Sequence, residues 1–369
     1  MRSTPAGWKL LIAAGLRASG GVRAGAGEEI VLSRETCGGL FLVPLTWSAE
    51  SGQDHDLLAL FDTGADGPTL IDPDAVERGS GQRVAEGTRV RMTGVAAGEA
   101  RFTTFRPRVH ELDHISRALG RELDVLLPFR AFDEFLLTLD YPRGELRISR
   151  DPLPPPDGAE VFSARGPDRR PWLRLEIGGR TRLMLVDSGA TGPFYLRSRG
   201  DLRWRTLLPP ALISQRFDRQ VKRRMGRLDE VVAVGPLTLV EPLAMLTGDT
   251  ELIGAQALAP LVVSFDQKRR RVRLRSSVEA PVRMRPYRGT GAVLRPIDGG
   301  LEIAEVVAGT PAEAAGVRAG DRLIAVDGIG VYERGCRPPG GPRAGEEHWT
   351  VRRGAETLEI TVPVVDLIP

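Results

Sequence analysis

Two short segments, each an aspartate followed by a hydroxyl residue and a glycine, carry groups suited to acid–base chemistry. The first is Asp62-Thr63-Gly64, and Asp187-Ser188-Gly189 follows 125 residues later. Each comes directly after an apolar run that predicts a buried strand, and each continues into a glycine-rich turn. Two carboxylates about 3 Å apart share one proton, so one can activate a water while the other donates to a carbonyl. The spacing therefore predicts a paired-carboxylate site.

The repeat extends to the elements that must position these turns. Asp140 lies 78 residues after Asp62, and Asp266 lies 79 residues after Asp187. Each ends an apolar run that is followed by a polar turn and a returning strand. A duplicated unit of about 110 residues explains this pattern most simply. The proline-rich run at residues 151–158 then falls between the copies as a stiff, non-helical linker.

Length and composition favour several modest β domains. The chain has 369 residues, with 43 glycines and 28 prolines, and short alternating apolar runs are common. The net charge of +3 comes mainly from arginines spread among acidic residues, so we predict no nucleic-acid partner. The basic run at residues 215–227 reads either as a loop over a cleft or as a plain solvated loop. No segment of the mature chain predicts a membrane span.

The paired motifs resemble those of the pepsin and retropepsin superfamily of aspartic proteases. The resemblance implies a mainly β fold with two tandem retropepsin-like lobes, at residues 29–150 and 171–277, that form a pseudo-dimer. Residues 151–170 would link them. It implies aspartic endopeptidase activity on proteins or peptides, with no metal and no cofactor. Asp62 and Asp187 would be catalytic, and the supporting turn residues would be Thr63, Gly64, Ser188 and Gly189.

Two further family features are matched unequally by the halves. A second hydrophobic-hydrophobic-glycine element is present as Leu252-Ile253-Gly254, but its counterpart at residues 125–128 reads Val-Leu-Leu-Pro. The missing glycine leaves the packing of the first turn open. Flaps of the family are glycine-tipped hairpins over the cleft, and the candidate here is Gly94.

A third region, at residues 286–365, is similar to a PDZ domain of the bacterial type. The run from Gly309 to Gly328 predicts a short helix beginning at Thr310-Pro311, a stop at Gly316 and a following strand. The resemblance implies that the backbone N–H groups of Gly289, Thr290, Gly291 and Ala292 bind the carboxylate of a C-terminal peptide, which adds as a strand.

Two other functions are compatible with the sequence. The first is a catalytically weak peptide-binding or scaffolding protein on a protease fold. The second is a zinc metalloprotease, because His110-Glu111-Leu112-Asp113-His114 satisfies the HExxH pattern if it lies on a helix.

The N-terminus and the cysteines leave the compartment open. Arg2 and Lys9 precede an apolar run, and small residues at 24–26 could be a cleavage site, so residues 1–28 are either an export signal to the periplasm or a disordered tail of a cytoplasmic protein. Cys37 and Cys336 are the only cysteines, and two thiols so far apart predict neither a disulfide framework nor a metal site.

Overall fold

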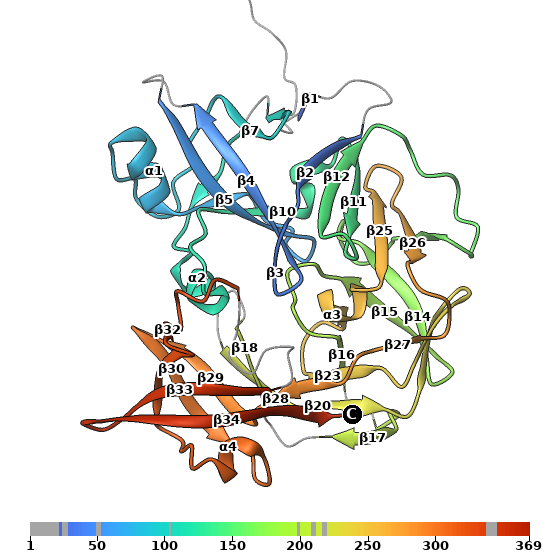
Figure 1. Ribbon diagram of the computed structural model, residues 1–369. Coiled ribbons are helices and arrows are strands. Elements are labelled where there is room, and N and C mark those ends of the chain that lie inside the picture. The colour runs from blue at the N-terminus through green and yellow to red at the C-terminus, as the bar shows by residue number, and fades with distance from the viewer. Residues whose placement is uncertain are drawn as a thin grey trace, which may run out of the picture.

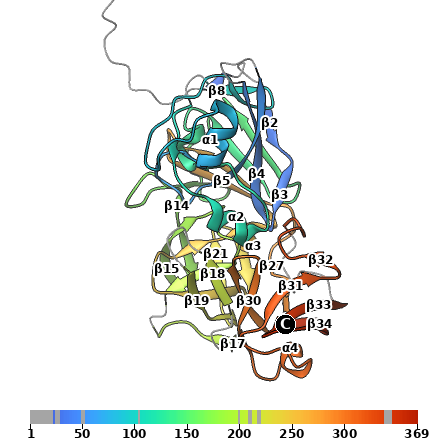
Figure 2. The same cartoon turned by 90° about the vertical axis from the view of Figure 1, so that its left-hand side faces the viewer.

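Strands dominate the chain, and they form two β-rich halves followed by a third β domain. The computed structural model describes residues 22–23, 29–48, 53–102, 105–197, 200–207, 212–215, 220–336 and 345–369. We call the described residues between 22 and 149 the first half, those between 161 and 276 the second half and those between 287 and 368 the C-terminal domain. The two halves stand one above the other, with the C-terminal domain beside the second (Figure 2).

The first half is built around a long hairpin that ends at Asp62. Its elements are β1 (Val22–Arg23), β2 (Ile30–Ser33), β3 (Glu35–Cys37), β4 (Leu40–Ser48), β5 (Asp54–Asp62), β6 (Leu70–Ile71), α1 (Pro73–Ser80), β7 (Val95–Ala97), β8 (Ala100–Phe102), β9 (Arg108–Val109), α2 (Asp113–Leu119), β10 (Val125–Pro128), the 3-10 helix η1 (Phe129–Phe132), β11 (Leu136–Asp140) and β12 (Glu145–Ser149). Strand β10 enters between β5 and β6 and runs parallel to β5, with Pro128 opposite Asp62. Strand β1 pairs with β8, whereas residues 1–21 and 24–28 of the expected leader lie outside the described residues.

The second half repeats this arrangement around Asp187. Its elements are β13 (Val161–Ser163), β14 (Trp172–Ile177), β15 (Arg180–Val186), β16 (Phe194–Arg197), β17 (Trp204–Leu207), β18 (Leu212–Gln215), β19 (Gln220–Arg223), β20 (Met225–Leu228), β21 (Val231–Val234), β22 (Leu237–Val240), β23 (Leu243–Thr247), β24 (Leu252–Ile253), α3 (Ala255–Leu258), β25 (Leu261–Asp266) and β26 (Arg271–Ser276). Strand β24 enters between β15 and β16 and runs parallel to β15. The order β4-β5-β10-β6 in one half therefore corresponds to β14-β15-β24-β16 in the other.

A six-stranded sheet joins the halves. Its order is β13-β26-β25-β11-β12-β2, so β11 and β25, the strands that end at Asp140 and Asp266, are antiparallel neighbours at its centre (Figure 1). Thr138 and Ser264 face each other across this pair, with their buried hydroxyls 3.0 Å apart. The nearly equal spacings of 78 and 79 residues in the sequence thus reflect two matching hairpins in one sheet.

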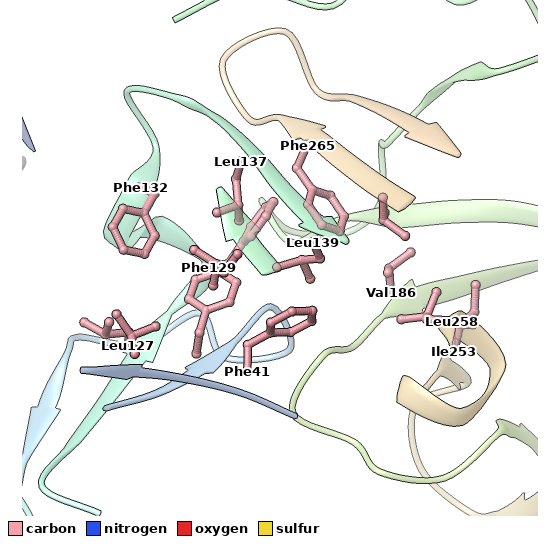
Figure 3. Close-up of a cluster of buried hydrophobic side chains, with 14 of the residues drawn as sticks. Phe41, Leu127, Phe129, Phe132, Leu137, Leu139, Val186, Ile253, Leu258 and Phe265 are labelled. Carbon is pink, nitrogen blue, oxygen red and sulfur yellow. The ribbon is translucent and has the colours of Figure 1, made fainter. Parts of the chain in front are cut away.

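A single hydrophobic core continues from one half into the other. Phe41, Phe129 and Leu139 of the first half and Phe265 of the second pack together below the sheet (Figure 3). The rings of Phe129 and Phe265 meet edge to face, 5.4 Å between centroids. Apolar residues occupy both faces of β4 because a smaller cluster around Leu42 and Leu60 packs on its other side. The two halves therefore fold as one body.

The segment between the halves is more than the linker that the sequence predicted. Strand β13, at residues 161–163, pairs with β26 and so extends the joint sheet. The Leu153 N–H also donates to the Asp266 carboxylate over 3.1 Å. Leu153 and β13 are therefore fixed to the second half.

The C-terminal domain has its own core and an edge strand that faces the halves. Its elements, with the preceding strand, are β27 (Val282–Arg283), β28 (Tyr287–Gly289), β29 (Ala292–Ile297), β30 (Gly300–Val306), α4 (Pro311–Ala314), β31 (Arg322–Val326), β32 (Ile329–Gly330), β33 (Gly345–Arg353) and β34 (Glu356–Ile368). The sheet order is β28-β34-β33-β31-β30-β29, and the fully buried Trp349 lies in its core. The short helix expected after Thr310 is present, and β34 runs three residues beyond the predicted boundary at 365.

The C-terminal domain is tied to both halves. Ile368 packs in the core of the halves, with Tyr287 against it, and β27 extends the sheet of the second half beside β22. Cys37 and Cys336 form a disulfide, with their Cα atoms 4.9 Å apart. The sequence prediction for these cysteines was wrong, because it could not anticipate that the C-terminal domain folds back onto the first half.

Candidate active site

Asp62 and Asp187 meet at the junction of the two halves. A Cβ placed on Gly64 would lie 2.5 Å from the Asp187 carboxyl carbon, and one on Gly189 would lie 2.4 Å from that of Asp62. Each carboxylate thus sits against the glycine of the opposite turn, where a side chain would collide with it. The Gly64 N–H donates to Asp62 over 2.7 Å, and the Gly189 N–H donates to Asp187 over 3.0 Å.

Hydroxyl groups lock the two turns to each other. The Thr63 N–H donates to the Ser188 hydroxyl over 3.0 Å, and the Ser188 N–H donates to the Thr63 hydroxyl over 2.8 Å. The two hydroxyls in turn donate across the interface, Thr63 to the Val186 carbonyl (2.7 Å) and Ser188 to the Phe61 carbonyl (3.2 Å). Both side chains are fully buried, so these bonds are shielded from water. The arrangement is reciprocal, as two copies of one motif require.

The environment makes the two carboxyls hold a proton. Burial raises the pKa of Asp62, although hydrogen bonds from the Gly64 N–H and from Asp187 oppose the rise. Burial raises the pKa of Asp187 well above its usual range, and the neighbouring charge of Asp62 adds to it. The pair therefore keeps one proton at a pH where an exposed aspartate has lost it.

The second element behind each turn is present in both halves. The Ala255 N–H donates to the Ala190 carbonyl over 2.7 Å, and the Phe129 N–H donates to the Ala65 carbonyl over 3.2 Å. Pro128 therefore takes the place of Gly254, and the strand–turn contact is kept without glycine. What the first half lacks is a donor, since the Gly254 N–H bonds the Pro193 carbonyl over 2.7 Å and proline has none.

Arg170 is a site residue that the sequence reasoning missed. Its guanidinium donates to the Gly64 carbonyl over 2.9 Å and is held by the Asp168 carboxylate at 2.7 Å. Burial raises the pKa of Asp168, but bonds from Arg170 and the Trp172 indole outweigh it and lower that pKa to about 2. The positive charge of Arg170 also lowers the pKa of both dyad carboxyls. The sequence feature that could have indicated Arg170 is the charged run Asp168-Arg169-Arg170 just before Trp172.

Tyr141 is a second missed neighbour of the dyad. Its ring packs edge to face on Phe41, with 5.0 Å between centroids. Among the described residues its buried hydroxyl has no hydrogen-bond partner. Burial raises the pKa of this phenol, and the charges of Asp187 and Asp62 raise it further, so it stays protonated.

A cavity of about 1040 Å³ opens above the dyad. Its lining comes from both halves and from the C-terminal domain: Asp62 and Asp187 lie in it with Ile115 and Leu119 of α2, and with Leu294 and Pro296 of β29. The space is large enough for a segment of polypeptide, since pockets for small molecules usually measure about 300–1,000 Å³.

Gly94 is not brought to the dyad. Its carbonyl accepts a bond from the Ser48 N–H, at the end of the β4–β5 hairpin farthest from Asp62, and it does not line the cavity. The expectation of a flap there fails because β7, which follows Gly94, pairs with β4 inside the sheet.

The zinc alternative lacks the geometry that it requires. Helix α2 begins only at Asp113, so His110 precedes it and the two histidines do not share a helical face. The His110 Nδ1 lies 2.7 Å from a Glu86 carboxylate oxygen. In the described part of the chain, no group of three His, Cys, Asp or Glu side chains is placed to hold a metal ion.

The predicted carboxylate loop lies at the start of β29. Gly289 ends β28, and Gly291 has the left-handed φ of +89° that a tight loop requires. Thr290 is buried and its carbonyl accepts a bond from the Ala312 N–H of α4, while its hydroxyl accepts from the Ala292 N–H over 3.2 Å. The loop is thus held by the short helix, and its Ala292 N–H has an internal partner.

Comparison with known proteins identifies one part of the chain. A search of curated proteins found no match. No helix among the described residues is long and apolar enough to cross a membrane. A family model for the PDZ domain matches residues 302–334, within the C-terminal domain. The chain therefore contains a C-terminal PDZ domain, which indicates the binding of protein or peptide partners.

Proposed function

We propose that the chain is an aspartic endopeptidase, made of two retropepsin-like lobes in a pseudo-dimer, whose PDZ domain recruits protein substrates. The observation that carries the proposal is the buried carboxyl pair held by reciprocal hydroxyl bonds between Thr63 and Ser188. A pair of raised carboxyl pKa values in a cleft is typical of acid–base catalysis.

The reaction follows from the shared proton. The ionised carboxyl of the pair takes a proton from water as the water oxygen attacks the scissile carbonyl carbon, and the protonated carboxyl donates its proton to the carbonyl oxygen. The resulting gem-diol collapses when the C–N bond breaks: the carboxyl that took the water proton passes it to the amine nitrogen, and the other carboxylate takes a proton back from a gem-diol hydroxyl. No covalent bond to the enzyme forms. Water and the peptide bond are consumed, and one carboxyl and one amine are released.

Cleavage of an unbiased peptide library tests the proposal. Asp62→Asn and Asp187→Asn should each lower turnover by about 10³-fold or more, and the double variant should be no worse, because groups that act as one unit are non-additive. Asp56→Asn, an exposed change on the same strand β5, is the matched control. Near wild-type turnover in either dyad variant would refute the mechanism.

An inhibitor comparison separates this reading from metal-dependent hydrolysis. A statine-type inhibitor should block cleavage because it resembles the gem-diol, whereas chelators should leave the rate unchanged. Loss of activity with a chelator, restored by zinc, would favour the HExxH segment instead.

A peptide-binding scaffold is the second candidate, and the PDZ match favours it specifically. Under this alternative the purified chain binds peptides, but no peptide of the library is cleaved at any pH between 3 and 8 (roughly the range over which carboxyl pairs titrate).

A further inference from the structure

We infer that the substrates are polypeptides with a free C-terminus, which bind along the edge strand β29 and are cleaved at a fixed distance upstream of that end. The inference rests on the proposed function, but its binding part can be measured without catalysis.

Strand β29 offers a backbone edge to a ligand. Among the described residues it pairs only with β30, at the end of the sheet order. PDZ domains bind an extended peptide as an added strand on such an edge, and backbone N–H groups capture its carboxylate. Here the loop at Gly289–Ala292 immediately precedes β29. A peptide held by its C-terminus at this loop therefore extends along β29 toward Ile297.

The far end of β29 opens into the cavity of the dyad. Leu294 and Pro296 are two residues apart, so they share one face of the strand, and both line the cavity that contains Asp62 and Asp187. The loop at Gly289–Ala292 does not line it. The part of a bound peptide upstream of its C-terminus is therefore the part that reaches the carboxyl pair.

Elements of the two halves, rather than the PDZ domain alone, complete the groove. Helix α2 packs against β29 from the first half, with Ile115 and Leu119 lining the cavity, and β18 packs against β29 from the second half (Figure 1). The Tyr332 hydroxyl donates to the carbonyl of Gly300 over 2.6 Å and closes the turn beside this wall. A ligand on β29 is consequently in contact with the protease fold as soon as it binds.

The distance between groove and dyad is fixed by covalent and packing contacts. The disulfide joins Cys336 to Cys37, which lies next to the dyad cavity, and Tyr287 packs against the core of the halves. The PDZ domain thus cannot move freely like a module on a flexible linker. The loop that binds the C-terminus and the carboxyl pair therefore keep a constant separation. The substrate is cut a constant number of residues upstream of its C-terminus.

Cleavage mapping by mass spectrometry tests whether the cut lies at a fixed distance from the free C-terminus. Three peptides that share one internal sequence are extended at the C-terminus by zero, two and four residues, each as the free acid and as the amide. The expected result is a cut that moves with the free C-terminus, and a rate at least tenfold lower for the amides. Cuts that stay at one internal sequence, equally fast for acid and amide, would overturn the inference while leaving the peptidase activity intact.

Binding to the Asp62→Asn chain tests the composite groove separately. The probe is a fluorescein-labelled pool of random decapeptides ending in valine, as free acid or amide, followed by fluorescence anisotropy. We expect the acid to bind at least tenfold more tightly and Ile115→Glu to weaken it at least tenfold. Ile329→Glu, an exposed change outside the cavity, should have no effect. Equal affinity of acid and amide, or an unaffected Ile115→Glu, would refute the groove even if no peptide were ever cleaved.

Discussion

At the scale of single residues, the buried carboxyl pair lowers the stability of the folded state at neutral pH. Burial raises the pKa of both carboxyls, and the neighbouring charge of Asp62 raises that of Asp187 further. The folded state therefore binds a proton that the unfolded chain releases above its ordinary pKa near 3.8. Over that window the folded state loses stability as pH rises, the reverse of the behaviour of an ion-paired aspartate.

Replacing Asp187 should stabilise the protein. Asp187→Asn removes the group that is costly to ionise, so its melting temperature at pH 7 should exceed that of the wild type by about 2 °C or more. The gain should shrink as pH falls from 7 toward 4, because the unfolded chain then approaches its ordinary pKa of 3.8 and begins to take up the proton as well. Thermal scans from pH 4 to 8 measure this, with Asp56→Asn as control. A gain independent of pH would contradict the assigned cause.

Removing a hydroxyl group that joins the two turns should destabilise the protein. Thr63→Val keeps the shape of the side chain but leaves the Ser188 N–H and the Val186 carbonyl without their buried partner, at a cost of about 1–3 kcal/mol. Thr357→Val, at an exposed position, is the control. Urea denaturation compares the two variants. A loss below about 0.5 kcal/mol for Thr63→Val, within the usual range of surface substitutions, would mean that the lock contributes little.

At the scale of elements, the two halves solve the same packing problem with different residues. Strand β24 leads into α3 through Gly254, where a Cβ would lie 2.3 Å from the Gly192 carbonyl oxygen and 2.8 Å from that of Ala190. Strand β10 leads into η1 through Pro128 and keeps the equivalent bond from Phe129 to Ala65. Glycine is needed at position 254 because the backbone of residues 190–192 passes close to it. The bond between the strand and the turn does not itself require glycine, since Pro128 keeps it in the first half.

Gly254→Ala should therefore destabilise the second half. The added methyl group meets backbone oxygens that cannot rotate away, so we expect a loss of roughly 1–3 kcal/mol. Gly248→Ala is a matched control, because no atom lies within 4 Å of its Cβ position. Denaturant unfolding of both variants measures the difference. Equal stability of the two would show that the turn at residues 190–192 adapts.

The local elements were predictable from the sequence, whereas their distant contacts were not. The paired turns, the hairpins ending at Asp140 and Asp266 and the helix after Thr310 follow from apolar periodicity and turn residues. The Cys37–Cys336 disulfide depends on how the third domain docks. The position of Gly94 depends on which strand β7 pairs with, and no local signal specifies either.

At the scale of the whole molecule, three β domains behave as one mechanical unit. The central sheet takes strands from both halves, and β27 and Ile368 bring the C-terminal domain into the same body. In addition, Lys222 of β19 lies 3.0 Å from Glu305 of the PDZ domain, although this exposed ion pair contributes little. The orientation of the PDZ domain is therefore set mainly by buried contacts and the disulfide.

Removing the disulfide should loosen this unit without unfolding its parts. We expect the Cys37→Ser/Cys336→Ser double variant to lose about 2–5 kcal/mol of stability, because the bond restricts a very long loop in the unfolded chain. Adding a reductant should lower the stability of the wild type to that of the variant and leave the variant unchanged. A wild type insensitive to reductant would show that the bond is not formed in solution.

The same bond would hold the chain together after a single backbone cut. It closes a ring of chain between residues 37 and 336, which includes both aspartates and most of the cleft. A single cut at any loop inside this ring opens it but releases nothing, since the two pieces stay joined through sulfur and through the shared sheet. A nicked molecule would keep its full mass on a non-reducing gel and separate into two bands only after reduction. Under the proposed peptidase function, such a form is the expected product of autolysis, and it retains both aspartates.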